Sequence, residues 1–271
     1  MHKLSDDICR EYIDILREKT GISLDNHKEH LIQTKIFKLL RKRQVENPEK
    51  HLDLLIEQRD ANEIQEFINI MTTNTTEFFR ENDHFEYLKN NFSYILQKNP
   101  RINRKNELRI WSAGCSTGQE PVTIAMVLKE LLEEGMDIKI LATDISTKVL
   151  TKAASGVYSQ TECEGIPQVY LNKYFIKDGE NFRVKDVILN TIKYRIFNLM
   201  GEHGFRHGFD IVFCRNVMIY FDQNMQQKLI DIFHKVLVPG GLLLLGHSES
   251  LINKKHDFLS YKPSIYMKKP I

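Results

Sequence analysis

The stretch LRIWSAGCSTGQEP at residues 108–121 passes from an apolar run into a turn of small residues, and a helix-like segment, VTIAMVLKELL, follows it directly. Small residues at such a turn let the backbone bend tightly and approach a ligand closely. A strand that leads through a small-residue turn into a helix is a typical unit of an α/β fold. The turn matches neither GxxxxGK[ST] nor GxGxxG, so it does not predict a phosphate cradle.

Further apolar runs follow along the second half of the chain, and helix-like stretches separate them. These runs occupy residues 138–144, 192–199, 209–216 and 241–247. Short apolar strands that alternate with helices indicate a parallel sheet covered on both faces, so the sequence predicts a doubly wound α/β domain. Within residues 156–191, YFIKD and FRVKDVI flank a turn at Gly179, which predicts a small antiparallel β-subdomain inserted into that domain.

The first part of the chain has a helical pattern instead. Apolar residues recur at spacings of three and four in segments 5–19, 25–44, 49–58 and 61–71. We therefore predict a small all-α domain with a linker helix over residues 1–96. A polar linker that contains Pro100 is expected at 97–107, and the α/β domain at 108–271, with the β-subdomain at about 156–191.

The composition is that of an ordinary globular protein, with 42% hydrophobic and 27% charged residues. No apolar run approaches the length of a transmembrane helix, roughly 18 residues, and the first residues lack the apolar core of a signal peptide. The four cysteines lie far apart with no C-x-x-C pair, which fits reduced thiols in a cytoplasm better than a disulfide framework. A net charge of +2 indicates no global attraction to nucleic acid.

The second predicted strand ends at Asp144. Ligands of a doubly wound sheet bind at the carboxyl ends of its strands, and an acid at this place accepts hydrogen bonds from ribose hydroxyls. Alternatively, Asp144 caps the helix that begins near Ser146. Together, the acid and the glycine turn favour an adenosyl ligand without a phosphate tail.

Several blocks of the sequence, in this order, resemble the successive motifs of the chemotaxis receptor glutamate methyltransferases, the CheR family. The blocks are TTNTTEFFR (72–80), WSAGCSTGQEP (111–121), LATDIS (141–146), FNL (197–199) and FCRNVMIYF (213–221). The resemblance implies a helical domain joined to a Rossmann-like methyltransferase domain with an inserted β-subdomain. It also implies an enzyme that uses S-adenosylmethionine to methylate glutamate side chains of chemoreceptors, leaving S-adenosylhomocysteine.

The resemblance assigns roles to single residues. Asn74, Thr76 and Arg80 would contact the cofactor near its methionine and sulfonium end, and Phe78 would lie beside it. Glu120 would face its amino-acid portion, although this chain has Gly118-Gln119-Glu120-Pro121 where the family usually has GEEP. Asp144 would bind the ribose, and Asn198 and Leu199 would frame the adenine. Gly114 would also contact the cofactor, and Arg215 and Asn216 would close the pocket.

Each of these residues also has a plain structural interpretation. Asn74 and Thr76 are suitable caps for a helix that starts near Glu77, and Phe78 fits a packing position. Tyr220 is as well suited to a core as to a site near the reacting methyl group. His203, His207 and His247 show no metal-ligand spacing, so we expect no metal.

The chemistry implied by the resemblance needs no general base. A glutamate side chain has a reference pKa of about 4.3, so at neutral pH it is already a nucleophilic carboxylate. The enzyme would hold oxygen, carbon and sulfur in line and exclude water. We expect Arg80 and Tyr220 to steer the incoming carboxylate through hydrogen bonds.

A basic stripe is the candidate surface for the receptor. Segment 27–43 holds six Lys or Arg residues against one acid, and on a helical wheel Lys28, Lys35, Lys38 and Lys42 share one narrow arc. The resemblance implies that this helix meets the acidic methylation helices of the receptor. A solvated face of a packed helix and a nucleic-acid contact are the alternatives.

The remaining expectations concern partners and rival functions. The short link around Asp178-Gly179 indicates a compact hairpin, so we expect no tether to a peptide at the receptor's C-terminus. We expect a cytoplasmic monomer that reaches a membrane only through the receptor. One rival function is a methyltransferase that acts on nucleic acid, but this chain has Cys214-Arg215-Asn216-Val217 after the fourth predicted strand, where such enzymes have a [DN]PPY-type loop. The other rival is a non-catalytic sensor or scaffold that binds S-adenosylmethionine.

Overall fold

The structure is a computed structural model that describes residues 4–24, 29–57, 60–132 and 135–271. Its N-terminal part packs four helices around one apolar core: α1 (Asp6–Thr20), α2 (Glu29–Arg43), α3 (Pro48–Ile56) and α4 (Ala61–Met71). Side chains of Ser5, Asn47 and Asp60 cap α1, α3 and α4 by accepting backbone N–H groups. The helical pattern of the sequence is confirmed for the described residues, while residues 25–28 of the predicted second helix and residue 58 of the third lie outside them.

The second part is built on a seven-stranded sheet with the order β6-β2-β1-β7-β8-β10-β9. Its parallel members are β1 (Glu107–Ala113), β2 (Asp137–Asp144), β6 (Ile192–Ile196), β7 (Phe209–Cys214) and β8 (Leu237–Leu245). All five were predicted from the apolar runs. The strands β9 (Phe258–Lys262) and β10 (Ile265–Lys268) pair antiparallel at one edge and were not predicted.

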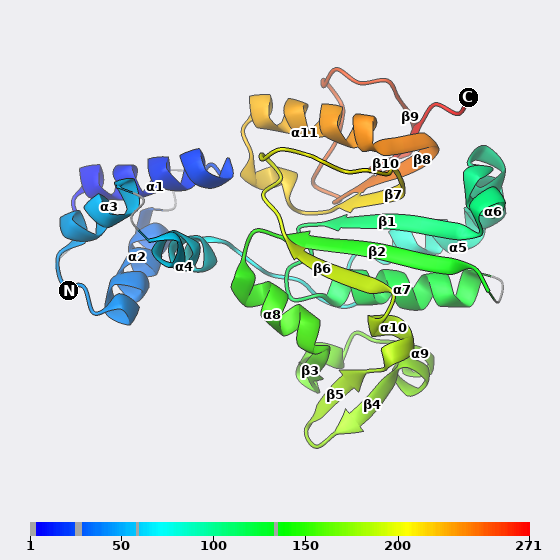
Figure 1. Cartoon of the computed structure of the whole chain (residues 1–271), viewed down its shortest axis with the longest axis horizontal. Coiled ribbons are helices and arrows are strands. Elements are labelled where there is room, and N and C mark those ends of the chain that lie inside the picture. The colour runs from blue at the N-terminus through cyan, green and yellow to red at the C-terminus, as the bar shows by residue number, and fades with distance from the viewer. Residues whose placement is uncertain (1–3, 25–28, 58–59, 133–134) are drawn as a thin grey trace.

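Helices cover both faces of this sheet, as the apolar strands require (Figure 1). On one face α5 (Asp83–Lys98) and α7 (Gln119–Leu131) pack on Ile110 and Phe213, and on the other α11 (Gln223–Val236) packs on Trp111. The short helices α6 (Arg101–Lys105) and α8 (Thr147–Ser155) flank the strands β1 and β2. None of the described helices is long and apolar enough to cross a membrane.

Residues 97–107 comprise the end of α5, the helix α6 and the first residue of β1. Asn99 and Arg101 both donate hydrogen bonds to the buried carboxylate of Asp210 on β7, at 2.7 and 2.9 Å. This segment is therefore fastened to the sheet at the start of the α/β domain.

The β-subdomain is a separate three-stranded antiparallel sheet with the order β3-β5-β4. Its hairpin is the one predicted: β4 (Phe175–Asp178) pairs with β5 (Asn181–Val184) from Phe175↔Val184 to Asp178↔Asn181. The strand β3 (Val157–Ser159) adds to the other side of β5. The helices η2 (Thr161–Cys163), α9 (Gln168–Tyr174) and α10 (Asp186–Leu189) complete the insertion.

The neighbours β1 and β7 are the point where the strand order reverses, which is where an open α/β sheet binds its ligand. In Figure 1 the carboxyl ends of β1 and β2 point toward the N-terminal helices. The segment between α4 and α5, residues 72–82, crosses from one part to the other at this edge.

Candidate active site

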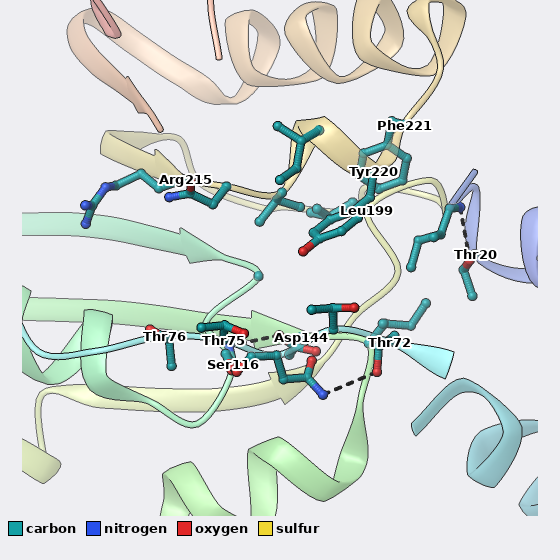
Figure 2. A pocket seen from close by; sticks show the side chains of 18 of the residues that line it. Thr20, Thr72, Thr75, Thr76, Ser116, Asp144, Leu199, Arg215, Tyr220 and Phe221 are labelled. Atoms are coloured by element: carbon teal, nitrogen blue, oxygen red, sulfur yellow. Dashed lines mark hydrogen bonds between the residues drawn. The ribbon is translucent and has the colours of Figure 1, made fainter. Parts of the chain in front are cut away.

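A cavity lies where the carboxyl ends of four parallel strands meet the helical domain. The residues that line it come from the end of α1, from segment 71–80, and from the segments that follow β1, β2, β6 and β7. In the close view, Asp144, Ser116 and Thr75 lie on one side of the cavity, and Tyr220 and Leu199 on the other (Figure 2). The turn η3 (Met218–Tyr220) carries Tyr220.

The glycine turn after β1 brings its backbone close to the cavity. Gly114 has φ +80°, and a Cβ there would lie 2.5 Å from Val217 Cγ2, so this position requires glycine. The N–H groups of Gly114 and Cys115 both donate to the Thr143 carbonyl, at 2.8 and 2.9 Å, and Gly118 N–H donates to the Cys115 carbonyl. Ser116 N–H donates to Asp144. These N–H groups are engaged within the protein, so the turn does not offer them to a phosphate.

Asp144 is buried at the end of β2, with 8% of its surface exposed. Its Oδ2 accepts the N–H of Ser116 at 2.9 Å and its Oδ1 accepts the N–H of Ser146 at 2.9 Å. Burial raises the pKa of Asp144 in spite of these hydrogen bonds. Since a carboxylate offers about four acceptor positions, Asp144 retains acceptor capacity for a ligand diol.

Arg215 links the start of α7 to segment 80–81. Its Nη1 donates to Glu120 Oε2 at 3.3 Å and its Nη2 to Glu81 Oε2 at 3.0 Å, and it also donates to the carbonyl of Arg80. Burial raises the pKa of Glu120 despite the Arg215 charge and a 2.7 Å hydrogen bond from Ser112. Burial would raise the pKa of Glu81 too, but Arg215 and the donors of His247 and Asn216 hold it below its ordinary value.

Arg80 sits in a strained turn. Phe79 and Glu81 on either side of it have φ +55° and +50°, a conformation that side chains with a Cβ rarely adopt. The turn is held by a hydrogen bond from Phe79 N–H to Thr123 Oγ1 at 3.3 Å and by the bonds of Arg215. Such strain persists where the surroundings fix the backbone, and it often accompanies functional sites.

Asn74 and its neighbours form the wall opposite Tyr220. Asn74 Nδ2 donates to Thr72 Oγ1 at 3.4 Å, and the Asn74 carbonyl accepts the hydroxyl of Ser116 at 2.8 Å. Segment 73–77 is not helical, so Asn74 and Thr76 do not cap a helix at Glu77. Both residues line the cavity instead.

The helical domain closes the remaining side through backbone contacts. Ser23 N–H donates to the carbonyl of Tyr220 at 2.8 Å, and Ile22 forms an isolated antiparallel bridge with Phe221. The side chain of Asn198 donates to the carbonyl of Lys19 at 2.8 Å and accepts Met200 N–H at 3.0 Å. Asn198 therefore joins the two parts of the chain at the rim of the cavity.

Glu249 shapes the loop that carries Asn216 and Tyr220. Its carboxylate accepts N–H groups of Gly246 at 2.7 Å, Asn216 at 2.8 Å and Ile219 at 3.2 Å. Asn216 itself has φ +58°. Glu249 is buried and is not among the residues that line the cavity, so it fixes the backbone of the loop from behind.

Comparison with known proteins identifies this arrangement. A family profile described as "CheR methyltransferase, SAM binding domain" matches residues 74–267, and one described as "CheR methyltransferase, all-alpha domain" matches residues 10–72. The chain belongs to the CheR methyltransferase family. It is thus an S-adenosylmethionine-dependent methyltransferase of chemotaxis, and the resemblance found in its motifs is confirmed.

Individual relatives match the CheR chain over nearly its whole length. A chemotaxis protein methyltransferase of Borreliella burgdorferi is 36% identical over 271 residues, which cover 98% of this chain and 95% of the relative. A chemotaxis protein methyltransferase of Escherichia coli is 36% identical over 269 residues, which cover 97% of this chain and 91% of the relative. Both the helical domain and the α/β domain are shared with these relatives.

This same cavity is lined by most of the residues that the motifs predicted for the site: Asn74, Thr76, Arg80, Gly114, Glu120, Asp144, Asn198, Leu199, Arg215, Asn216 and Tyr220. Phe78 does not. Its ring is buried against Tyr158 and Phe175, at centroid distances of 4.9 and 5.7 Å, so it packs the α/β domain on the β-subdomain. The sequence reasoning missed Ser116 and Glu81, whose partners lie far away in the chain.

The basic stripe of α2 is largely engaged with the protein itself. Lys35 donates to backbone carbonyls of segment 71–72, and Lys42 pairs with Glu66 on α4 at 2.6 Å. Lys38 is exposed, and Lys28 lies outside the described residues. The stripe is therefore only partly available to a receptor.

One cluster of the CheR chain has the residue types of a metal site. Ligand atoms of Glu81, His84 and His247 lie within 4.8 Å of one another. However, Glu81 already accepts hydrogen bonds from Arg215 Nε and Nη2, Asn216 Nδ2 and His247 N–H. A carboxylate offers about four acceptor positions, so no lone pair of Glu81 is left for an ion.

The cavity fits the cofactor of the family. Asp144 could accept ribose hydroxyls, and the largely buried carboxylate of Glu120 could face a cationic amino-acid portion. Apolar side chains of Ile22, Ile145, Phe197, Leu199 and Val217 also line the cavity and would suit an adenine ring. The engaged glycine turn agrees with a ligand that has no phosphate.

Proposed function

We propose that this CheR protein esterifies glutamate side chains in the cytoplasmic methylation helices of chemoreceptors. The observation that carries the proposal is the set of groups around the cavity. Among the described residues that line it there is no histidine, lysine or cysteine; of its three acids, Glu120 and Asp144 are held by hydrogen bonds and Glu77 is exposed to solvent. An amine or hydroxyl substrate needs a base to remove its proton, whereas a carboxylate with a pKa of about 4.3 needs none.

The cofactor supplies an activated methyl group, and the residues of the chain bind and orient. Asp144 and Glu120 hold the ribose and the amino-acid portion, with Asn198 and Leu199 at the adenine and Gly114 under the ribose side. Asn74, Thr76, Arg215 and Asn216 enclose the rest. Arg80 and Tyr220, which both line the cavity, would steer the incoming carboxylate by hydrogen bonds.

The experiment is a methyl-transfer assay with labelled S-adenosylmethionine and chemoreceptor cytoplasmic domains. We expect label on the receptor that mild base releases as methanol, since esters are base-labile and methylamines are not. A receptor in which the methylated glutamates are replaced by alanine is the matched control. Label that survives base would refute glutamate esterification, and label on added nucleic acid would support a different substrate.

The site of action follows from the same proposal. The enzyme works on cytoplasmic helices, so we propose that it is a cytoplasmic monomer and meets the membrane only through the receptor. The exposed residues of the α2 stripe, with Lys38 among them, are the proposed contact to the acidic helices. If this contact is electrostatic, the rate at which the receptor is labelled should fall steeply as salt is added.

A further inference from the structure

Lys35 is tied to the backbone that leads into the cavity. Its Nζ donates to the carbonyls of Met71 at 2.8 Å and Thr72 at 3.2 Å, and to Thr73 Oγ1 at 3.3 Å. Met71 is the last residue of α4 and Thr72 its C-cap. An ammonium group has three donors, so these contacts use all of them and place a positive charge at the negative end of the α4 dipole.

The setting of Lys35 differs from that of its neighbours on the stripe. Lys35 is half-buried, and burial followed by the charge of Lys38 lowers its pKa. Lys38 and Arg41 are exposed, and no acidic side chain among the described residues lies within ion-pair distance of either. Lys35 faces the protein, while Lys38 and Arg41 face solvent.

From Lys35 a continuous set of hydrogen bonds reaches Asp144. Thr72, whose carbonyl accepts Lys35, also accepts Asn74 Nδ2 at its Oγ1, at 3.4 Å. The Asn74 carbonyl accepts Ser116 Oγ at 2.8 Å, and Ser116 N–H donates to Asp144 Oδ2 at 2.9 Å. Thr72, Thr73, Asn74, Ser116 and Asp144 all line the cavity.

We propose that Lys35 is a positioning residue for the cofactor, which fixes segment 72–74 against the glycine turn, and that the receptor contact of α2 rests on Lys38 and Arg41. The first half deepens the proposed function, because it needs the cofactor to occupy this cavity. The charge on Lys35 is used inside the protein.

The test compares Lys35→Met with Lys38→Met. For Lys35→Met we expect the Kd for S-adenosylhomocysteine and the KM for S-adenosylmethionine to rise about tenfold, as expected for losing hydrogen bonds to a charged group, with little change in kcat or in receptor KM. Lys38→Met should keep the cofactor Kd within about twofold and raise the receptor KM, because it removes an exposed charge only. Wild-type binding is measured first, so that absent binding would count against the cavity itself.

Further variants separate positioning from folding. Lys35→Arg keeps a charged donor and should recover most of the affinity, and Lys35→Gln, which keeps one donor group, serves if Lys35→Met does not fold. In an Asn74→Ala background the Lys35→Met effect should shrink to about threefold or less, because coupled residues are not additive. An unchanged cofactor Kd in folded Lys35→Met with a raised receptor KM, or a full effect in the Asn74→Ala background, would overturn the proposal.

Discussion

The two buried acids of the cavity show how single side chains acquire different tasks. Glu120 pairs with the guanidinium of Arg215 and accepts the hydroxyl of Ser112, whereas the partners of Asp144 are backbone N–H groups of Ser116 and Ser146. The backbone donors fix the orientation of Asp144 while leaving acceptor positions toward the cavity. The helix α8 has Ser146 as its N-cap residue, so Asp144 shapes the turn before the helix and does not cap it.

Asp144→Ala should therefore weaken the binding of S-adenosylhomocysteine by about 1–3 kcal/mol, the cost of leaving buried hydrogen-bonding groups unpaired. Calorimetric titration of the purified protein measures this. Asp137→Ala, at the exposed start of the same strand, is the control and should leave the affinity unchanged. Equal affinity for Asp144→Ala and wild type would reduce Asp144 to a turn-forming residue.

His84 gives a second prediction at the scale of one residue. It is fully buried, and burial together with the Arg215 charge lowers its pKa to about 4. The unfolded chain, with a histidine pKa of about 6.5, binds more protons than the folded chain between these values, so stability falls as the pH drops from 6.5 toward 4. Between pH 7 and pH 5 this one residue should account for a loss of about 2 kcal/mol.

Urea unfolding at both pH values, for wild type and His84→Gln, isolates that contribution. Other histidines titrate in the same range, so the difference between the two proteins is the quantity to compare. The variant should lose less stability on acidification than the wild type, even if it is less stable at pH 7. Identical pH dependence would show that folding does not lower the pKa of His84.

At the scale of elements, the apolar strands and amphipathic helices were predictable because their patterns are local. The strand β9 was missed because it lies at the sheet edge, where it buries Phe258 but exposes most other residues, and β10 was missed because it is a run of only four residues between β8 and β9. The helical wheel placed Lys35, Lys38 and Lys42 on one arc of α2 correctly. It could not show that this arc borders α4, whose carbonyls and Glu66 take up two of the three charges.

The strained turn at residues 79–81 accounts for the position of Phe78 in the same way. Left-handed backbone at Phe79 and Glu81 sends Phe78 into the core while Arg80 lines the cavity. The sequence Phe78-Phe79-Arg80 does not predict this conformation, since non-glycine residues seldom adopt it. It depends on Thr123 and Arg215, which lie distant in the chain.

The β4–β5 hairpin gives a prediction about the receptor. Two residues, Gly179 and Glu180, connect its strands, which leaves no long loop to wrap a peptide, although β4 is an open edge of the small sheet. We predict that methylation proceeds at equal rates on matched receptors with and without their last few residues. A titration of the free C-terminal peptide should detect no micromolar binding. A large loss of rate on truncation would show that the β4 edge captures the peptide as an added strand.

On the scale of the whole molecule, the cavity exists only because the helical domain closes over the sheet. Thr20, Ile22 and Leu24 line it from the helical side, and the carboxyl ends of the strands form the other side. The domain limits of 1–96, 97–107 and 108–271 stay a prediction. What the structure adds is a contact at residues 17–23: Arg17 pairs with Asp222 at 2.7 Å, and Ser23 donates to Tyr220.

Gly21 lies within this contact between the helical domain and the sheet, and the substitution Gly21→Ala tests whether the contact shapes the cavity. Gly21 ends α1 with φ +77°, and a Cβ there would lie 2.5 Å from Met200 Cγ. The substitution combines a left-handed strain of roughly 1 kcal/mol with a clash, so the wall formed by Thr20 and Ile22 should move away from Leu199 and Phe221. We expect the Kd for S-adenosylhomocysteine to rise at least about fivefold, beyond any loss of thermal stability.

Gly204→Ala, where a Cβ meets nothing within 4 Å, is the matched control and should bind as the wild type does. If Gly21→Ala lowers the melting temperature and yet binds S-adenosylhomocysteine normally, the helical domain is not part of the cofactor site, and the cavity must be assigned to the sheet alone.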